Sequence, residues 1–167
     1  MKDLCSLAEA KFEQTPTYNK IWRAKEKAIA LAFGSWKESY AMLPNLLEAY
    51  ARKNPGTKWV VLGDPISETE HLFTKAAWSW GAARMGFAYC RPVIGIDATF
   101  LTGRYAGKLL VATAYDSNNQ LLPIAFGLVD KEDNEGWSWW MRWLRREVLD
   151  PDRHITGLHI FLCGTFN

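Results

Sequence analysis

Apolar residues recur at helical spacing over the first third of the chain. The spacing predicts one helix over residues 17–34, with Gly34 as its end, and a second helix over residues 36–53. The second pattern places four apolar side chains on one face: Tyr40, Leu43, Leu47 and Tyr50. Because proline disrupts a helix interior, Pro44 predicts either an early end of this helix or a boundary at Leu43.

The period of the pattern changes after a strong turn at residues 54–57. Strands are predicted over 58–62 and 71–78, with a break at 63–65 after the first of them. Residues 82–89 fit either a short helix or a loop.

An apolar run then ends in a carboxylate. Residues 93–96 read V-I-G-I, which predicts a buried strand with Asp97 at its end. Two further strands are predicted over 108–115 and 121–129, joined by a hairpin turn at 116–119. Short connections between three strands predict an antiparallel meander.

A tryptophan-rich helix follows, over residues 135–149, with Asp133 and Asn134 available as its cap. Its main apolar stripe is formed by Trp137, Trp140, Met141, Leu144 and Val148. A second apolar side is formed by Trp139 and Trp143. Two apolar sides indicate a helix packed between layers. At helical spacing these tryptophans favour a role in the core over stacking on nucleic-acid bases.

A last strand is predicted over 155–162. The order of three strands, a helix and a fourth strand returning parallel to the first is typical of the opening of a ribonuclease H-like fold. We therefore expect an α/β (α+β-like) protein with an incomplete ribonuclease H-like core. Its expected parts are a helical segment at 1–57, short strands and a connector at 58–90, and the truncated core at 91–167.

Composition narrows the function classes. With 49% hydrophobic and 14% aromatic residues the chain is globular, and its net charge of +2 gives only weak overall attraction to nucleic acid. Cys5, Cys90 and Cys163 lie far apart and form no zinc-finger spacing with the histidines, which predicts a reduced intracellular protein without a zinc site. No signal peptide and no membrane-spanning run is expected.

Asp97 is the candidate for chemistry, because an acid on a buried strand needs partners or a metal. No Asp or Glu follows Asp152. Asp116 is expected at the far end of the sheet from Asp97. An acidic loop fits either a metal site near Asp97 or a solvated loop with a helix cap; its acids are Asp130, Glu132 and Asp133. Thr99, two residues after Asp97, argues against the exonuclease pattern, which needs an acid there.

Basic residues interleave with Tyr18 and Trp22 in the first predicted helix: Lys20, Arg23, Lys25 and Lys27. They occupy more than one face and fit either contact with DNA phosphates or an ordinary solvated helix. The same two interpretations hold for three arginines of the later helix, Arg142, Arg145 and Arg146.

Four short patterns occur in order between residues 96 and 140: I-D-x-T-x-L, D-x-N-N-Q, P-I-A-F, and an acidic loop leading to W-x-W-W. In this combination the chain resembles the transposase domain of plant Mutator-like elements (the MULE family), over roughly residues 17–156. The resemblance implies a cut-and-paste DNA transposase whose acidic triad binds two Mg²⁺ or Mn²⁺ ions. Asp97 matches the first acid of that triad.

The resemblance also implies DNA, in the form of transposon ends, as the partner, a nuclear location and no membrane association. No clear import signal is visible. The family pattern is lost after Thr156, and the second and third acids are missing. We expect a catalytically inactive fragment, from a shifted reading frame or a mis-spliced gene model. The alternatives are a non-catalytic module that binds DNA or a full-length transposase relative, and an unstable remnant.

Overall fold

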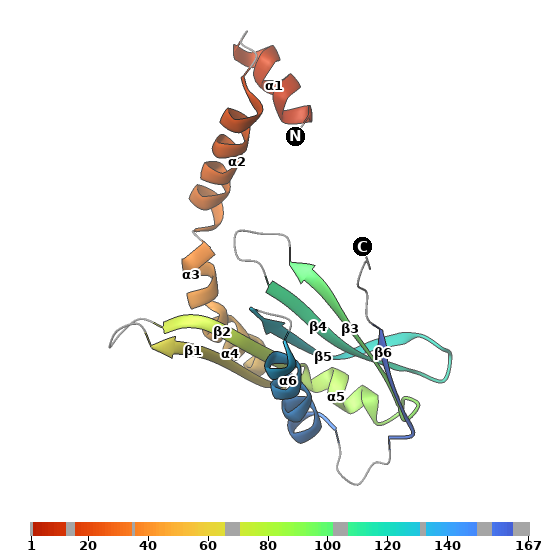
Figure 1. Cartoon of the computed structure of the whole chain (residues 1–167). Coiled ribbons are helices and arrows are strands. Elements are labelled where there is room, and N and C mark those ends of the chain that lie inside the picture. Colours follow the sequence, from red (N-terminus) through yellow and green to blue (C-terminus); the bar gives the residue numbers. More distant parts are fainter. Residues whose placement is uncertain are drawn as a thin grey trace. The chain divides into compact units, whose positions relative to one another are not determined.

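The fold is described from a computed structural model of the 167-residue chain (Figure 1). The structure describes residues 2–12, 16–34, 36–65, 71–101, 107–130, 133–149 and 155–161. The chain forms two compact units, residues 1–40 and 41–167. The predicted segments 58–90 and 91–167 contribute strands to the same sheet of the second unit.

The first unit is helical. It contains α1 (Lys2–Phe12), α2 (Tyr18–Phe33) and most of α3 (Trp36–Ala41). The predicted first helix is confirmed as α2, and Gly34 ends it with a φ of 81°, a conformation that glycine adopts at little cost. Helix α1 was not predicted. It lies against α2, where Ile21 is buried.

Pro44 marks a helix boundary, as one of the two interpretations predicted. Helix α3 ends at Ala41, and α4 (Leu43–Lys53) carries Pro44 in its first turn. The first turn tolerates proline because its backbone N–H groups have no partner inside the helix. Leu47 on α4 is almost fully buried.

The second unit is built on a six-stranded open mixed sheet in the order β1-β2-β5-β4-β3-β6. Its strands are β1 (Lys58–Pro65), β2 (His71–Ser79), β3 (Val93–Leu101), β4 (Gly107–Tyr115), β5 (Leu121–Val129) and β6 (Gly157–Phe161). All neighbours are antiparallel except β3 and β6, which are parallel. The predicted meander is therefore confirmed as β3-β4-β5.

Strand β1 corrects one prediction. The break expected at residues 63–65 is wrong, because β1 continues through them and pairs with β2 up to Pro65. The register shifts between Leu62 and Gly63, which is how a strand accommodates such residues. Because β1 is an edge strand of the described sheet, Pro65 removes no hydrogen bond from the sheet interior.

The chain crosses over from β5 to β6 through α6 (Asn134–Glu147). Asp133 caps this helix as expected: its Oδ1 accepts a hydrogen bond from the Gly136 N–H at 2.7 Å. The crossover places β6 parallel to β3, with Ile94 beside Leu158. The sequence-based order of three antiparallel strands, a helix and a parallel fourth strand is thus present.

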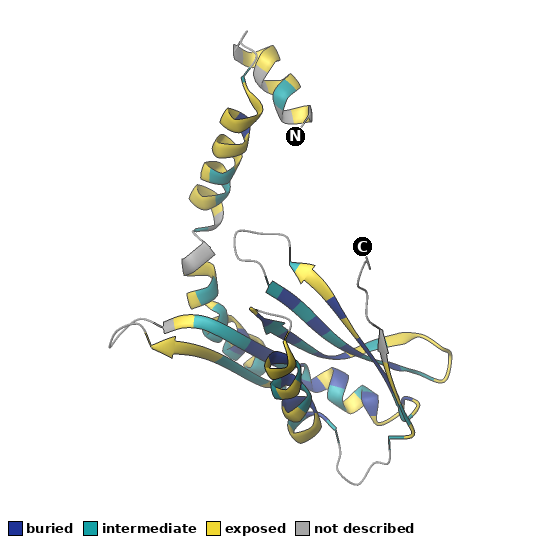
Figure 2. Ribbon diagram, viewed as in Figure 1, coloured by how far each residue is buried: buried dark blue, intermediate teal, exposed yellow. Residues whose placement is uncertain are grey.

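The core lies between the sheet and the helices α5 (Gly81–Phe87) and α6, and Figure 2 shows the buried positions along the central strands. Alternate residues of β3 and β4 are buried there: Ile94, Ile96, Ala98, Leu110, Ala112 and Ala114. Trp140 of α6 is fully buried over Gly127, where a Cβ atom would meet the indole ring. The predicted core role of Trp140 and Trp143 is confirmed by their burial.

The turn at residues 54–57 caps the start of α5 from a distance in sequence. The Thr57 hydroxyl accepts from the Gly81 N–H at 3.1 Å, and the Asn54 side chain accepts from the Ala82 N–H at 3.0 Å. The Arg84 guanidinium donates to the Gly56 carbonyl at 2.6 Å. The bonds to Thr57 and Asn54 supply partners for N–H groups that a helix cannot satisfy internally. Of the helix and the loop expected for residues 82–89, the structure has the helix, as α5 over Gly81–Phe87.

Candidate active-site face around Asp97

Asp97 lies in the middle of β3, so the prediction that it ends the strand is wrong. The strand continues for four residues to Leu101 and pairs with β4 along that whole length. Thr99 and Phe100 follow Asp97, and both residue types favour the extended conformation. The pairing of Phe100 with Lys108 also extends the strand, because the Lys108 ammonium lies 3.5 Å from the centre of the Phe100 ring.

The side chain of Asp97 is on the face of the sheet opposite α5 and α6. Successive strand residues point to opposite faces, and Ile96 and Ala98 are buried in the core beneath those helices. Asp97 and Thr99 are exposed on the other face. Oδ1 of Asp97 accepts a hydrogen bond from the Ala98 N–H at 2.8 Å, which orients the carboxylate locally.

A shallow hollow of about 310 Å³ adjoins Asp97 on this face. It is lined by Asp97, Ala98, Thr99, Leu109, Val111, Thr113, Tyr115 and Leu121. Thr113 donates its hydroxyl proton to the Gly95 carbonyl at 3.3 Å. Sequence reasoning missed the lining residues of β4, although their alternation with the buried Leu110, Ala112 and Ala114 places them on one face.

His159 also lies on the face of Asp97. The parallel register places it beside Gly95, while Asp97 is beside Phe161. Residues two apart on a strand share a face, so His159 is the diagonal neighbour of Asp97 on the next strand. An exposed carboxylate and an exposed imidazole therefore occupy adjacent strands on one face. The histidine was not singled out from the sequence, because the register of β6 was not predictable.

The other candidate acids lie elsewhere. Asp116 closes the β4–β5 turn, where its Oδ1 accepts from the Asn118 and Gln120 N–H groups at 2.8 Å, at the end of the sheet near Ile94. Asp130 follows β5 near Gly107, which pairs with Leu101. Leu101 is four positions beyond Asp97, a distance of about 13 Å along the strand.

The acidic loop therefore does not meet Asp97 through Asp130. Asp133 is used as the cap of α6, which fits the interpretation of a solvated loop and helix cap. Glu132 lies outside the described residues. Within the parts of the chain that the structure describes, no three His, Cys, Asp or Glu side chains are grouped so that they could hold a metal ion.

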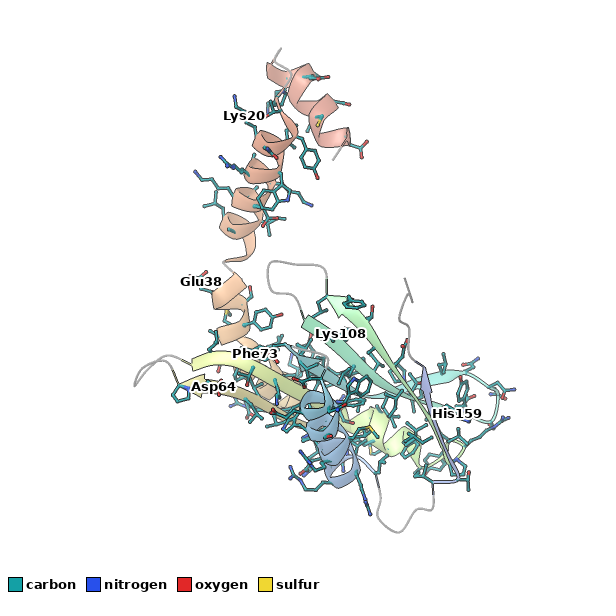
Figure 3. All side chains as sticks on the ribbon, in the orientation of Figure 1. Lys20, Glu38, Asp64, Phe73, Lys108 and His159 are labelled. Atoms are coloured by element: carbon teal, nitrogen blue, oxygen red, sulfur yellow. The ribbon has the colours of Figure 1, made fainter. Side chains whose placement is uncertain are left out.

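The basic residues of α2 divide between two faces, as expected from the sequence. Lys20, Arg23 and Lys27 follow the spacing i, i+3, i+7 and share one exposed face, and Lys20 projects from this helix in Figure 3. Lys25 lies on the face of Tyr18 and Trp22 instead. These residues belong to the first unit and Asp97 to the second.

Three arginines lie on α6, the helix that covers the face opposite Asp97. Arg142, Arg145 and Arg146 therefore do not border the hollow beside Asp97. Cys90 is buried and its thiol donates to the Gly86 carbonyl at 3.5 Å, Cys5 is half-buried, and Cys163 lies outside the described residues. No described helix combines the length and apolar character needed to cross a membrane.

One comparison with known proteins bears on this face. Residues 93–156 match the family model of the MULE transposase domain. The match supports a Mutator-like transposase domain here and suggests that the protein is transposase-derived. It spans β3, β4, β5 and α6, with Asp97 in its first strand. Neither the curated proteins nor the solved structures contain a match to the chain. The resemblance of residues 17–92 to the same family stays a prediction.

Domains of this family are generally metal-dependent. Asp97 fits a metal ligand, because it is a carboxylate exposed on an accessible face. A pair of cations needs several converging carboxylates, whereas Thr99, Val111 and Thr113 surround Asp97. The described residues therefore fit one ligand of a metal site and do not fit a two-metal centre.

Proposed function

We propose that this chain is a transposase-derived DNA-binding protein with a ribonuclease H-like core, in which Asp97 holds the position of the first metal-binding acid. The observation that carries the proposal is the place of Asp97 within the matched segment. It is exposed on the first of three antiparallel strands, and the crossover helix then returns β6 parallel to that strand. Transposase function in the intact family implies contact with DNA.

The chain on its own is proposed to bind DNA without cutting it. In the family reaction the metal pair supplies an activated water or 3′ hydroxyl and stabilises the leaving oxygen. On the face of Asp97, the neighbouring strands supply His159 and the hydroxyls of Thr99 and Thr113. This set holds too few anionic oxygens for the charge of two divalent cations.

DNA contact is assigned to the exposed basic face of α2, defined by Lys20, Arg23 and Lys27. Three cations on consecutive turns match a row of phosphates, which they contact without reading base sequence. Local clustering is required, because the net charge of +2 is too small for general attraction to DNA. A protein with this role would act in the nucleus.

We expect the full chain to bind a 20-base-pair duplex with an affinity that falls as salt is raised. Replacing two residues of the basic face, Arg23→Gln/Lys27→Gln, is expected to lower the slope of log K against log [salt] by about two, because each lost phosphate contact removes about one released counterion. Fluorescence anisotropy of a labelled duplex between 50 and 200 mM salt, roughly the range over which such contacts weaken, measures the slope.

The matched control is Arg52→Gln/Lys53→Gln on α4, which removes the same charge from another exposed helix. An equal fall in slope for both variants would show that net charge, and not the basic face of α2, attracts DNA. Absence of salt-dependent binding would reject the DNA-binding function. A broad, non-cooperative thermal transition of the parent chain would then favour an unstable remnant.

A further inference from the structure

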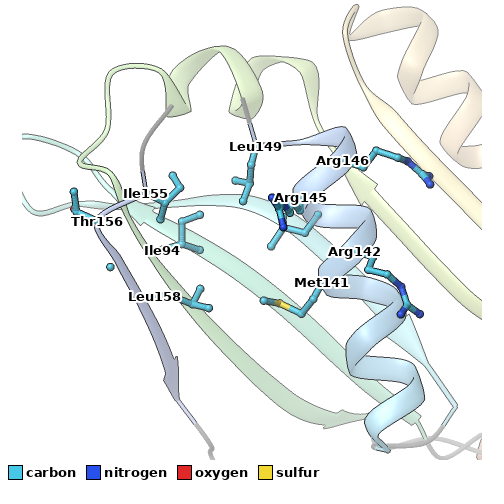
Figure 4. A pocket seen from close by; sticks show the side chains of 11 residues that line it. Ile94, Met141, Arg142, Arg145, Arg146, Leu149, Ile155, Thr156 and Leu158 are labelled. Atoms are coloured by element: carbon cyan, nitrogen blue, oxygen red, sulfur yellow. The ribbon is translucent and has the colours of Figure 1, made fainter. Parts of the chain in front are cut away.

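A groove runs along α6 on the core side of the sheet, where Ile94 of β3 and Leu158 of β6 form its floor (Figure 4). Its volume is about 990 Å³. It is lined by Ile94, Met141, Arg142, Leu144, Arg145, Arg146, Leu149, Ile155, Thr156, Gly157 and Leu158. Ile94 and Asp97 have opposite parity on β3, so the groove lies on the face opposite the candidate active site. An inference about it does not rest on the proposed function.

The groove is apolar and incompletely covered. The Leu158 side chain is 49% exposed, and Met141, Leu149 and Ile155 are only partly buried although they pack against the core. Removal of such an apolar surface from water by a partner lowers the free energy of the system, which favours binding. Strand β6 borders the groove and is the edge of the described sheet.

The shape of the groove suits a helix. Met141 and Arg145 lie one turn apart on the side of α6 that faces the groove, and Leu149 lines the groove just beyond the end of the helix. Parallel strands are normally covered by helices, and a second helix packs about 8–10 Å from the first. A second helix that packed beside α6 would therefore cover the floor formed by β3 and β6.

Charge identifies the kind of helix. In Figure 4 the side chains of Arg142 and Arg146 extend away from the groove, whereas Arg145 stays on the groove side. Arg146 donates to Glu147 at 2.7 Å, and this bond lowers the pKa of Glu147. Among the described residues, no carboxylate lies within ion-pair distance of Arg145. Within the described residues, the groove therefore combines an apolar floor with the positive charge of Arg145 at its wall.

We propose that this groove binds an amphipathic helix of a separate protein, with the helix's apolar face on Ile94 and Leu158 and a carboxylate against Arg145. The basic helix α2 of a second copy does not fit, because its lysines and arginine would be brought toward Arg145. Recognition of an apolar helix face by a groove, with charges at the margin fixing its register, is a general mode of peptide binding.

The probe is a labelled 18-residue helical peptide with Leu at positions i, i+3, i+4 and i+7 of each repeat and Glu at its margins. A second peptide carries Lys in place of each Glu. Anisotropy with the full chain is expected to show micromolar binding of the Glu peptide and at least tenfold weaker binding of the Lys peptide. Arg145→Glu should reverse this preference, and Leu158→Asp should weaken binding of both peptides at least tenfold.

Arg52→Glu on α4 is the matched charge control and should leave the preference unchanged, because Arg52 lies outside the groove. Near-UV circular dichroism of each variant shows whether it keeps the parent's packing. Reversal by Arg145→Glu alone would support the proposal even if Leu158→Asp failed to fold. Equal binding of the two peptides by the parent would overturn the proposal. It would also be overturned if neither peptide bound when the full chain was present at 100-fold molar excess over the labelled peptide.

Discussion

Replacing Trp140 with alanine is expected to lower the free energy of unfolding of the sheet-containing unit by about 3–5 kcal/mol. Trp140 is fully buried, and its ring lies edge-on to Trp137 with centroids 6.2 Å apart. It also occupies the space above Gly127, which has no side chain of its own to fill that space. Because the sheet backbone around Gly127 is fixed by its neighbours, the cavity left by the indole cannot close fully.

Trp140→Phe separates packing from hydrogen bonding. The Trp140 Nε1 atom is buried without a hydrogen-bond acceptor in the described part of the chain, so removal of its N–H costs no bond. We expect Trp140→Phe to destabilise far less than Trp140→Ala. Urea unfolding followed by far-UV circular dichroism measures both. Equal losses for the two variants would contradict the packing argument, as would a loss below about 1 kcal/mol for the alanine variant.

Gly81→Ala is expected to destabilise the same unit by about 1–3 kcal/mol, because the added methyl group has no space. A Cβ atom at Gly81 would overlap the carbonyl oxygen of Pro55, which belongs to the backbone of the turn that caps α5. Either that turn or the first residue of α5 must move. The move would strain the bonds from Gly81 to Thr57 and from Ala82 to Asn54.

Gly86→Ala in the same helix is the matched control. Its Cβ would meet only the end of the flexible Leu122 side chain, at 3.2 Å, and alanine favours the helix over glycine by up to about 1 kcal/mol. Thermal unfolding of the two variants compares them directly. We expect a lower melting temperature for Gly81→Ala and an unchanged or higher one for Gly86→Ala. Equal melting temperatures for the two variants would contradict the claim that the turn at residues 54–57 stabilises the start of α5.

The elements that the sequence predicts correctly are those decided by residues close to one another along the chain. The hairpin from Asp116 to Gln120 has turn residues between alternating strands, and Asp133 stands where a helix cap is required. The boundary at Leu43 follows from Pro44. In each case the residues that decide the structure are within a few positions of one another, so their preferences can be read without knowing the fold.

Elements that depend on distant contacts were missed or misplaced. The cap of α5 joins Asn54 to Ala82, 28 residues apart, and no local pattern shows such a bond. The extension of β3 beyond Asp97 depends on its pairing with β4. The β1 break was predicted from Gly63 and Pro65, but pairing with β2 outweighs their weak strand preference.

The candidate site shows the same division. Asp97 was identified from the motif around it, and the structure places it on the exposed face of β3. Its neighbours were not predicted, because Thr113 and His159 reach this face only through strand register. The assignment of Asp97 as the first metal-binding acid stays a proposal.

Titration of the full chain with Mn²⁺, followed by paramagnetic broadening of backbone amide NMR signals, tests the central claim most directly. Broadening is expected to centre on Asp97, Ala98 and Val111, at millimolar Mn²⁺ because one carboxylate holds a divalent ion weakly, and to be lost in Asp97→Asn. The variant keeps an oxygen that can accept from the Ala98 N–H. Broadening that persists in Asp97→Asn, or centres on Asp116 or Asp130, would contradict the account.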